Sequence, residues 1–419
     1  MHHFNYRDGR LFAEDVDLTE LASKVATPAY VYSEATLRRH FSVFRDAFGD
    51  RQTLIAYSVK ANSNLAVLNV LASEGAGADV VSGGELARAL NVGIAPEKIV
   101  FSGVGKTRDE IEAALKAGIG QFNVESANEL DAINEIASTL GMHAPIALRI
   151  NPDVAAGGHD KISTGKKHDK FGIAWGDARG LYTKARAMKG INVKGVDVHI
   201  GSQIADLAPF EAAFRKVGGL IEDLRADGCT IETLDLGGGL GIPYGEGEIP
   251  PHPDDYANMI KKVTAPLDVK LIFEPGRMIA GNAGILLSRV IYVKESEGKR
   301  FLILDAAMND LIRPAMYDAF HDIWPVAEPG TQKTSYDVVG PVCESSDCFA
   351  KDREIAPLQA GDLVAIMSAG AYGAAQSSQY NTRPLVPEIL VNGENHAVIR
   401  RRPSFEEIIA LEEMPDWLE

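Results

Sequence analysis

Short apolar strands and amphipathic helical segments alternate along much of the chain, and this order constrains the fold more than any other feature. Stretches rich in Val, Ile and Leu recur from residue 54 onward, at 54–60, 78–82, 98–103, 121–126, 145–152, 193–201, 233–239 and 268–276. Between most pairs lies a segment with helical periodicity that a glycine closes, as at 83–93, 109–118 and 126–141. Eight strand–helix units in succession predict an α/β fold, a (β/α)8 barrel of the TIM type.

The pattern changes beyond residue 280. Runs typical of strands follow one another without regular helices between them, at 285–295, 299–308, 335–341, 362–370 and 388–393. They predict a second, mainly antiparallel β domain, sandwich-like or barrel-like in form. We expect the barrel over residues 28–280 and the β domain over 281–419, to which residues 1–27 add an N-terminal strand. A long polar stretch within 153–175 has the length typical of a functional lid.

Composition and charge exclude several classes of protein. The net charge of -16 comes from 42 basic and 58 acidic residues that are interleaved, which argues against a nucleic-acid partner. No apolar run is long enough to span a membrane, and the first residues lack the apolar core of a signal peptide. Cys229, Cys343 and Cys348 offer neither a disulfide framework nor the paired spacing of a zinc site. We expect a cytoplasmic protein with no membrane partner and no bound metal.

Polar residues gather at the C-terminal ends of the expected barrel strands, the face on which barrel enzymes carry their chemistry. They are Lys60, Asp79, Ser82, Asn123, Glu125, Arg149, Asn151, His199, Ser202, the glycines 237–239 and the segment 274–277. Each has an ordinary structural explanation, but their convergence on one face predicts an active site. They include no cluster of His and carboxylate ligands, which disfavours a metal-dependent hydrolase.

Lys60 ends the first expected strand after the run AYSV, where its ammonium would be desolvated. Burial lowers the pKa of a lysine and prepares the amine for Schiff-base chemistry. Position alone fits equally well a lysine that reaches solvent or pairs with Asp79 or Glu125. Both interpretations stay open at this point.

Two further motifs suit a phosphate and a nitrogen heterocycle. The glycines of GGGLG (237–241) follow a strand and would let backbone amides approach an anion, although a tight turn also explains them. Glu274 and Arg277 flank a rigid turn. The carboxylate would keep a cofactor ring nitrogen protonated, or the two side chains would form a structural ion pair. His199 also has two interpretations that stay open, namely a residue of the site and a histidine of the core that hydrogen-bonds to a neighbour.

Three short segments of the β domain combine reactive or charged side chains with small turn residues. They are RPAMY (313–317), GPVCESSD (340–347) and GAYG (370–373). Arg313 and Tyr317 lie four residues apart, so a helix would place them on one face. Surface turns and ordinary packing explain such segments as well.

Together these segments resemble the fold-type-III pyridoxal-phosphate-dependent decarboxylases, barrel enzymes related to alanine racemase. The resemblance covers nearly the whole chain and follows the family's order. It runs through AYSVKAN (56–62), DVVSGGE (79–85), HIGSQI (199–204), DLGGGLGIPY (235–244), FEPGR (273–277), RPAMY, GPVCESSD and GAYG. Each motif is short, but eight ordered matches do not arise by chance. The polar stretch within 153–175 resembles the family's lid.

The resemblance implies pyridoxal 5'-phosphate as the cofactor and a role for each matching residue. Lys60 would hold the cofactor as a Schiff base, His199 would stack on its ring and Glu274 would meet the ring nitrogen. The remaining cofactor contacts would come from Asp79, Ser202, Gly238, Gly239, Pro275, Gly276, Arg277 and Tyr372. The substrate would meet Arg277, Arg313, Tyr317, Glu344 and Tyr372. Cys343 would deliver a proton after carbon dioxide leaves, and the family places its CESSD loop in a partner subunit, which implies a homodimer with shared active sites.

The substrates of the decarboxylases in this family differ at the end far from the carboxylate that is lost. Two arginines and a glutamate match the second amino-acid group of meso-2,6-diaminopimelate, whereas ornithine would leave buried arginines unpaired. We therefore expect decarboxylation of meso-diaminopimelate to L-lysine. The rivals are decarboxylases of ornithine, arginine or carboxynorspermidine, which CESSD disfavours, and a cofactor carrier without turnover, which the β domain disfavours. A racemase-like reaction through Tyr372 stays open.

Overall fold

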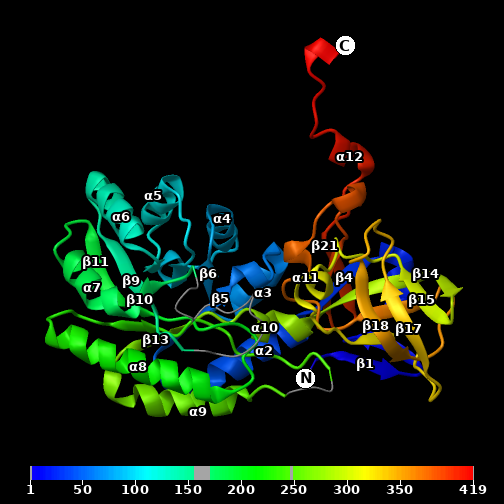
Figure 1. Ribbon diagram of the computed structural model, residues 1–419, viewed down its shortest axis with the longest axis horizontal. Coiled ribbons are helices and arrows are strands. Elements are labelled where there is room, and N and C mark those ends of the chain that lie inside the picture. Colours follow the sequence, from blue (N-terminus) through cyan, green and yellow to red (C-terminus); the bar gives the residue numbers. More distant parts are fainter. Residues whose placement is uncertain (1, 155–169, 246–248, 419) are drawn as a thin grey trace. The chain divides into compact units, whose positions relative to one another are not determined.

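The structure, a computed structural model, describes residues 2–154, 170–245 and 249–418, and the chain divides into two compact units. One unit spans Leu37–Ala280, and the other combines Met1–Thr36 with Gly281–Glu419. Figure 1 shows alternating strands and helices in the first unit and a β-rich second unit. Most of the stretch expected to act as a lid lies outside the described residues, so its role stays a prediction.

Eight parallel strands close into a barrel in the first unit. In order of pairing they are β9 (Ala144–Asn151), β11 (Ile191–Asp197), β12 (Thr233–Asp235), β13 (Lys270–Phe273), β5 (Thr53–Ser58), β6 (Gly77–Val80), β7 (Ile99–Phe101) and β8 (Gln121–Val124). The ring closes because β8 pairs with β9, and the short strand β10 (Ile173–Ala174) also pairs with β9. The predicted parallel barrel and its eight strands are confirmed.

Helices alternate with these strands, and their ends lie where the sequence places capping residues. The helices are α2 (Glu34–Asp46), α3 (Leu65–Ser73), α4 (Gly83–Asn91), α5 (Arg108–Ala117), α6 (Ala127–Leu140), α7 (Ala178–Arg186), α8 (Leu207–Ala226), α9 (Pro253–Thr264) and α10 (Arg277–Ala280). The side chains of Ser82 and Ser126 accept hydrogen bonds from amides in the first turns of α4 and α6. Gly118 and Gly141 end α5 and α6 in the left-handed conformation that glycine adopts without strain.

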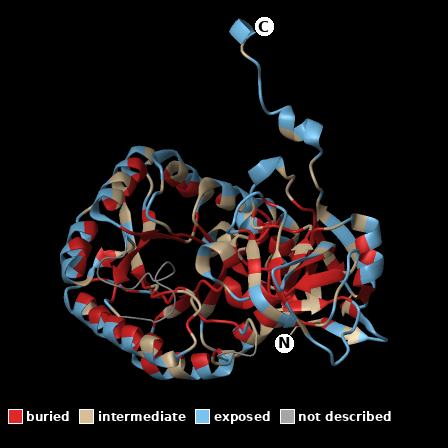
Figure 2. Ribbon diagram, turned by 45° about the vertical axis from the view of Figure 1, so that its right-hand side comes forward, coloured by how far each residue is buried: buried red, intermediate tan, exposed pale blue. Residues whose placement is uncertain are grey.

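Aromatic side chains join the outer helices to the barrel wall. The Phe48 and Phe273 rings lie 4.3 Å apart, and Phe44 meets Phe273 edge-on. Tyr256 of α9 packs edge-on against Phe210 of α8. Burial of each such side chain contributes about 1.5–3 kcal/mol. In Figure 2, buried residues follow the strands, whereas the outer faces of the helices are exposed.

The second unit is built on a nine-stranded mixed sheet. Its strands are β4 (Ala29–Ser33), β14 (Gly284–Ser296), β15 (Lys299–Leu304), β16 (Ile323–Pro325), β17 (Thr334–Val339), β18 (Cys348–Ile355), β19 (Leu363–Ile366), β20 (Glu388–Asn392) and β21 (Asn395–Arg400). Most pairs are antiparallel, but β15–β17 and β4–β20 are parallel. The predicted, mainly antiparallel β domain is therefore confirmed. Its helices are α1 (Leu18–Val25), α11 (Arg313–Tyr317) and α12 (Phe405–Ile409).

The N-terminal residues contribute more to this second unit than one strand. Strands β1 (Phe4–Arg7), β2 (Arg10–Ala13) and β3 (Val16–Asp17) form a small sheet of their own. Strand β4 pairs with β14 and β20, so residues up to Thr36 group with the β domain. The expected start of the barrel at residue 28 therefore lies earlier than the division at Leu37.

Two further observations concern the chain as a whole. No helix among the described residues combines the length and the apolar character that crossing a membrane requires. Cys229, Cys343 and Cys348 are all free thiols, as the absence of a disulfide framework in the sequence predicts.

Candidate active site

Lys60 lies just beyond the end of β5, in the single turn Val59–Ala61. Its Nζ is 3.1 Å from Oδ2 of Asp79, which also accepts a hydrogen bond of 2.7 Å from the Ser58 hydroxyl. The Asp79 side chain is fully buried, whereas that of Lys60 is 40% exposed. The expected desolvation of the amine is therefore not found. Lys60 pairs with Asp79 and stays accessible, because the short turn carries it past the packed strands.

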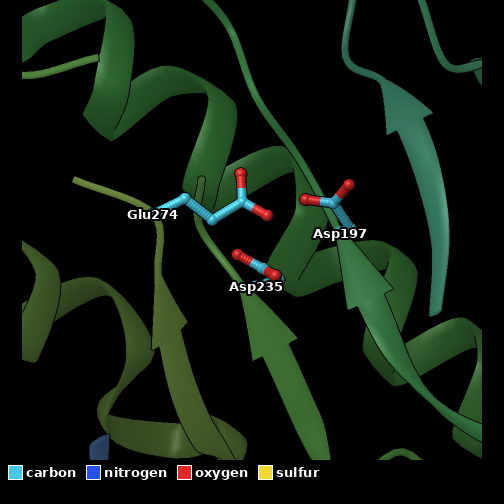
Figure 3. Close-up of side chains that lie close together, drawn as sticks. All are labelled: Asp197, Asp235 and Glu274. Atoms are coloured by element: carbon cyan, nitrogen blue, oxygen red, sulfur yellow. The ribbon is translucent and has the colours of Figure 1, made fainter. Parts of the chain in front are cut away.

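Three carboxyl groups meet at the ends of neighbouring strands, as Figure 3 shows. Asp197 ends β11, Asp235 ends β12 and Glu274 follows β13, and one oxygen of each lies within 4.8 Å of the others. Two like charges at 4.8 Å repel by roughly 3 kcal/mol even at an effective dielectric constant of about 20. All three groups therefore cannot be ionised together without a cation.

Burial is the main cause of the altered titration of this carboxyl cluster. It raises the pKa of Asp197 and of Glu274 well above the usual range for carboxyl groups. Burial, followed by the charge of Asp197, raises the pKa of Asp235 to about 8. The sequence prediction of no such cluster at the strand ends is wrong, since Asp197 and Asp235 were not among the candidates.

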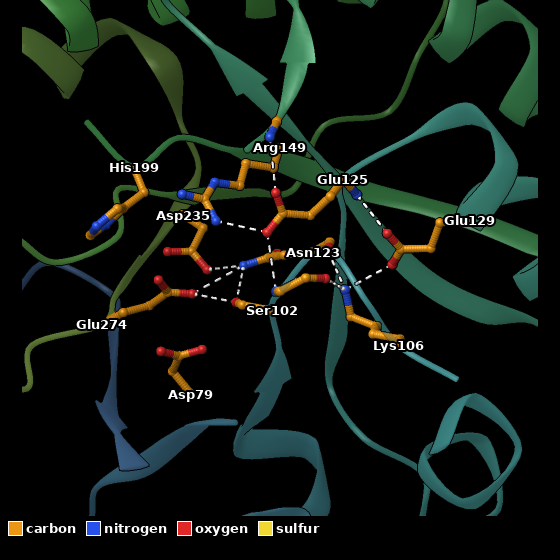
Figure 4. A network of polar contacts seen from close by, with 12 residues as sticks. Asp79, Ser102, Lys106, Asn123, Glu125, Glu129, Arg149, His199, Asp235 and Glu274 are labelled. Atoms are coloured by element: carbon orange, nitrogen blue, oxygen red, sulfur yellow. Dashed lines mark hydrogen bonds and ion pairs between the residues drawn. The ribbon is translucent and has the colours of Figure 1, made fainter. Parts of the chain in front are cut away.

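Asn123 links two members of the cluster, as the dashed lines of Figure 4 show. Its Nδ2 lies 3.1 Å from Oδ2 of Asp235 and 3.1 Å from Oε1 of Glu274. The Ser102 hydroxyl donates to the same Glu274 oxygen at 3.0 Å. Two neutral donors thus fix Oε1 of Glu274 and leave Oε2 for another partner.

Ion pairs hold the neighbouring strand ends in place. Arg149 donates to Oε1 of Glu125 at 2.7 Å, and Oε2 of the same carboxylate accepts from the Gly172 amide at 2.9 Å. Lys106 donates to Glu129 at 2.7 Å and to the Asn123 carbonyl at 2.8 Å. Both cations are thereby neutralised locally, and they tie β7, β8 and β9 together at the end that carries the site.

The His199 ring is held neutral. Its Nδ1 accepts a hydrogen bond of 3.1 Å from the Gly238 amide, so this nitrogen carries no proton. Burial, and then the charge of Arg149, lowers the pKa of His199 well below its usual value. A Cβ on Gly238 would lie 2.4 Å from the Glu274 carbonyl oxygen, and one on Gly239 would lie 2.5 Å from that of Gly201. Only glycine allows this close backbone packing.

Arg277 begins α10, and two neutral hydroxyl groups accept hydrogen bonds from its side chain. It donates to the Tyr244 hydroxyl and, at 3.1 Å, to the Ser202 hydroxyl. Within the described residues Glu274 forms no ion pair, so the structural Glu274–Arg277 pair considered from the sequence is absent. Residues 275 and 276 precede the helix, and the amides in its first turn have no partner within it.

Arg313 and Tyr317 lie at the two ends of α11 in the β unit, so the predicted helical spacing is confirmed. A Nη of Arg313 lies 2.8 Å from Nε2 of His321, whose Nδ1 lies 2.8 Å from the Met367 carbonyl oxygen. Since that carbonyl only accepts, Nδ1 carries the proton and Nε2 accepts from Arg313. His321 thus fixes the guanidinium, a role that sequence reasoning missed.

The loop 340–347 is held by Asp347, whose two carboxylate oxygens accept from the Met308 and Val342 amides at 2.7 Å each. Cys343 and Glu344 are exposed on it. The Glu344 carboxylate accepts from the hydroxyls of Tyr380, at 2.8 Å, and of Ser346. These two hydrogen bonds lower the pKa of Glu344, which keeps it anionic.

Tyr372 lies in a tight segment of the β unit with a φ of +57°. A Cβ on its neighbour Gly373 would meet the Ala369 carbonyl oxygen at 2.6 Å, which explains that glycine of GAYG. Tyr372 is partly buried.

The structure thus brings the expected residues together in local groups. In the barrel unit, Lys60 contacts Asp79, His199 contacts Gly238 and Ser202 contacts Arg277. Sequence reasoning missed Ser102, Asp197, Asp235, Tyr244 and His321. Ser102 follows β7, and Asp197 and Asp235 end β11 and β12, so their place at the C-terminal ends of recognised strands was the available signal.

Comparisons with known proteins agree with this arrangement. The family model described as pyridoxal-dependent decarboxylase, pyridoxal binding domain, matches residues 34–281. The diaminopimelate decarboxylase of Zymomonas mobilis is 51% identical over 419 residues, with 99% of each chain covered. The crystal structure of diaminopimelate decarboxylase from M. jannaschii in complex with L-lysine is 40% identical, with a TM-score of 0.95 and 100% of each chain covered. That of Helicobacter pylori, also complexed with L-lysine, is 43% identical, with a TM-score of 0.91 and with 94% of this chain and 98% of that chain covered. The chain therefore belongs to the diaminopimelate decarboxylases, a family of pyridoxal-dependent decarboxylases.

Proposed function

We propose that this chain decarboxylates meso-2,6-diaminopimelate to L-lysine and carbon dioxide, with pyridoxal 5'-phosphate as its cofactor. The observation that carries the proposal is the buried Glu274 carboxyl group, which lacks a cationic partner among the described residues, in the barrel that also presents the Lys60 amine. A carboxylate with one oxygen free suits a protonated ring nitrogen.

The barrel residues fit this cofactor on three counts. Lys60 is accessible, with its amine beside a buried carboxylate that would stabilise a positively charged nitrogen. Glu274 has two neutral donors on one oxygen and needs a cation to stay ionised. No side chain fits at Gly238 or Gly239, so none covers the backbone of this turn where a phosphate would approach it, although the Gly238 amide itself donates to His199.

When bound, pyridoxal phosphate supplies an aldehyde that binds amines and a ring that accepts the electrons left by departing carbon dioxide. Glu274, whose orientation is fixed by Asn123 and Ser102, would hold the proton at the ring nitrogen. His199, being neutral, would pack against the ring without adding charge. Gly238, Gly239, Ser202 and the residues 275–277 bind the phosphate, with Tyr372 nearby. Lys60 would hold the aldehyde until a substrate amine binds, and Asp79, which pairs with Lys60, would balance the charge of that amine.

The far end of the substrate sets the specificity. Arg313, Tyr317 and Arg277 bind the distal carboxylate, Tyr372 adds a contact, and Glu344 binds the distal ammonium. The support for these roles is that His321 fixes the Arg313 guanidinium and that hydrogen bonds keep Glu344 anionic. A substrate without the distal carboxylate would leave these cations unpaired, which costs binding free energy.

Cys343 delivers the proton that replaces carbon dioxide at the α-carbon. Its place on a loop that Asp347 fixes, with the thiol exposed, supports this role. We further propose that the chain acts in the cytoplasm as a homodimer in which this loop completes the partner subunit's site. An exposed, fixed loop that carries both Cys343 and Glu344 suits such an exchange.

The test is chemical labelling of the purified protein. We expect a yellow protein that, after borohydride reduction and digestion, carries the cofactor mass on the peptide with Lys60. The Lys60→Ala variant should be colourless and unlabelled, whereas the matched Lys261→Ala variant, on α9 away from the strand ends, should behave as wild type. A protein that gains neither colour nor adduct with added cofactor would remove the proposal.

A further inference from the structure

The buried acids at the barrel's strand ends outnumber the cations that could neutralise them. Five carboxyl groups are buried there, those of Asp79, Glu125, Asp197, Asp235 and Glu274, with exposed fractions from 0% to 7%. The cations that face them are Lys60 and Arg149. Lys60 pairs with Asp79 and Arg149 with Glu125, so both are already matched. In the part of the chain that the structure describes, the other three acids form no ion pair, and the charges of Lys60 and Arg149 that reach Glu274, and that of Arg149 that reaches Asp197, do not offset the effect of burial on their pKa values.

Other charged groups near the cluster do not change this balance. Lys106 and Glu129 neutralise each other in a buried pair. His199 is neutral because its Nδ1 accepts from a backbone amide. The three acids of Figure 3 must therefore bind protons or a cation that the chain itself does not supply.

The hydrogen-bond donors distinguish the three acids. Glu274 accepts on Oε1 from both Ser102 and Asn123. Asp235 accepts on Oδ1 from the Gly237 amide at 3.0 Å and on Oδ2 from Asn123 at 3.1 Å. The buried Oδ1 of Asp197 has no partner, and this side chain is 1% exposed. Asp197 is therefore the acid that is least able to remain ionised.

We propose that Asp197 and Asp235 are positioning residues that stay protonated in the holoenzyme, so that the single negative charge of the cluster rests on Glu274. This inference rests on the proposed function, because the ring nitrogen supplies the one cation that ionises Glu274. Neutral Asp197 and Asp235 leave no competing charge that could draw the proton of the ring nitrogen deeper into the barrel. Asn123 then fixes both Asp235 and Glu274 through one amide group.

The proposal fixes how many carboxylic acids the site holds in each state. The cofactor-free protein should hold three protonated acids, namely Asp197, Asp235 and Glu274. Cofactor binding should remove one, because Glu274 becomes ionised against the ring nitrogen. The full-length protein is therefore examined with and without cofactor by infrared spectroscopy of the carboxylic acid C=O stretch, in H2O and D2O.

Substitutions assign each infrared band. Asp197→Asn and Asp235→Asn carry no charge, as a protonated acid does, so each should remove one band. At position 235 the amide nitrogen cannot accept a hydrogen bond, whereas both oxygens of Asp235 accept, from the Gly237 amide and from Asn123, so the band and not the turnover is the readout. Glu274→Gln should remove the band that cofactor binding removes. Asp254→Asn, a substitution at a side chain that is 64% exposed on α9, serves as a control that leaves all bands unchanged.

A second measurement reads the ring directly and does not depend on turnover. With 15N-labelled pyridoxal phosphate, the nitrogen should have the chemical shift of a protonated ring in wild type, Asp197→Asn and Asp235→Asn, but not in Glu274→Gln. An unprotonated ring in either Asn variant would overturn the proposal. So would the absence of carboxylic acid bands in the wild-type protein, or a divalent metal ion found bound to the three acids.

Failure of the proposed function would give a different result. A protein that never binds the cofactor would still show three bands, with no change when the cofactor is added, and Lys60 would stay unlabelled. Because the wild-type protein alone shows whether cofactor binding removes a band, a variant that does not fold does not remove the test. Glu85 and Asp310, whose pKa values burial raises to about 7 and about 6, contribute the same signal with and without cofactor.

Discussion

Buried ionisable groups make the stability of the barrel depend on pH. In the carboxyl cluster, Asp235 is the residue whose raised pKa defines the pH range of this effect. Burial raises its pKa from 3.8 to about 8, so the folded chain keeps a proton that the unfolded chain releases. The resulting stabilisation is complete below pH 3.8 and is lost as the pH rises through about 8. The free energy of unfolding of the cofactor-free protein should therefore fall over this range. Urea unfolding should show a shallower fall for Asp235→Asn, and equal slopes would contradict the argument.

His321 offers a second test, which concerns how Arg313 binds the distal carboxylate of the substrate. Its Nε2 accepts from Arg313, so His321→Leu removes an acceptor for a charged donor and should raise the KM for meso-diaminopimelate roughly tenfold or more. His321→Gln, which can present an oxygen to the guanidinium, should lose less. Steady-state kinetics and the cofactor dissociation constant are measured together. A parallel loss of cofactor affinity would mean that His321 serves the fold rather than the substrate.

Sequence reasoning found the residues with a recognisable local motif and missed those defined by a distant partner. Lys60, Glu274 and the glycines at 237–239 stand in short motifs at strand ends. His321 and Asp197 stand in no motif, and their importance comes from Arg313, Met367 and the neighbouring carboxyl groups. The exposure of the Lys60 amine was also misjudged, because the turn after β5 carries this side chain past the packed strands.

The elements of the barrel followed from the sequence because their signals are local. Parallel strands that are covered on both faces have continuous apolar runs, and Ser or Gly at the helix ends limits each helix. Strand β4 was harder, since all five of its residues are buried and nothing in AYVYS specifies which sheet it joins. Its pairing with β14 and β20 joins segments that lie far apart in the chain.

The turn after β12 gives a test at this scale. Gly238→Ala would place a Cβ 2.4 Å from the Glu274 carbonyl oxygen, so the turn must move and the amides there shift. We expect the cofactor to bind at least about tenfold more weakly, measured by titration of the cofactor-free protein. Gly219→Ala is the matched control, since a Cβ there meets nothing within 4 Å and α8 gains a better helix former. Unchanged cofactor affinity in Gly238→Ala would mean that the turn at residues 237–239 does not bind the phosphate.

At the scale of the whole molecule, two units contribute different chemistry. The barrel unit carries the amine, the acid cluster and the glycine turn, whereas the β unit carries Arg313, Cys343 and Glu344. The order of the motifs along the chain was sufficient to predict both units and the family. Which polar groups compensate one another could not be predicted, because it depends on side-chain contacts across the barrel, such as those of Asn123 of β8 with Asp235 and Glu274 at β12 and β13.

The central claim is tested most directly by carbon dioxide release from meso-diaminopimelate, measured beside ornithine, arginine and lysine with the purified, cofactor-loaded protein. The account predicts turnover of meso-diaminopimelate to L-lysine, with the other three substrates slower by about a hundredfold or more because they leave the distal cations unpaired. Comparable or faster release from ornithine, arginine or lysine would contradict it.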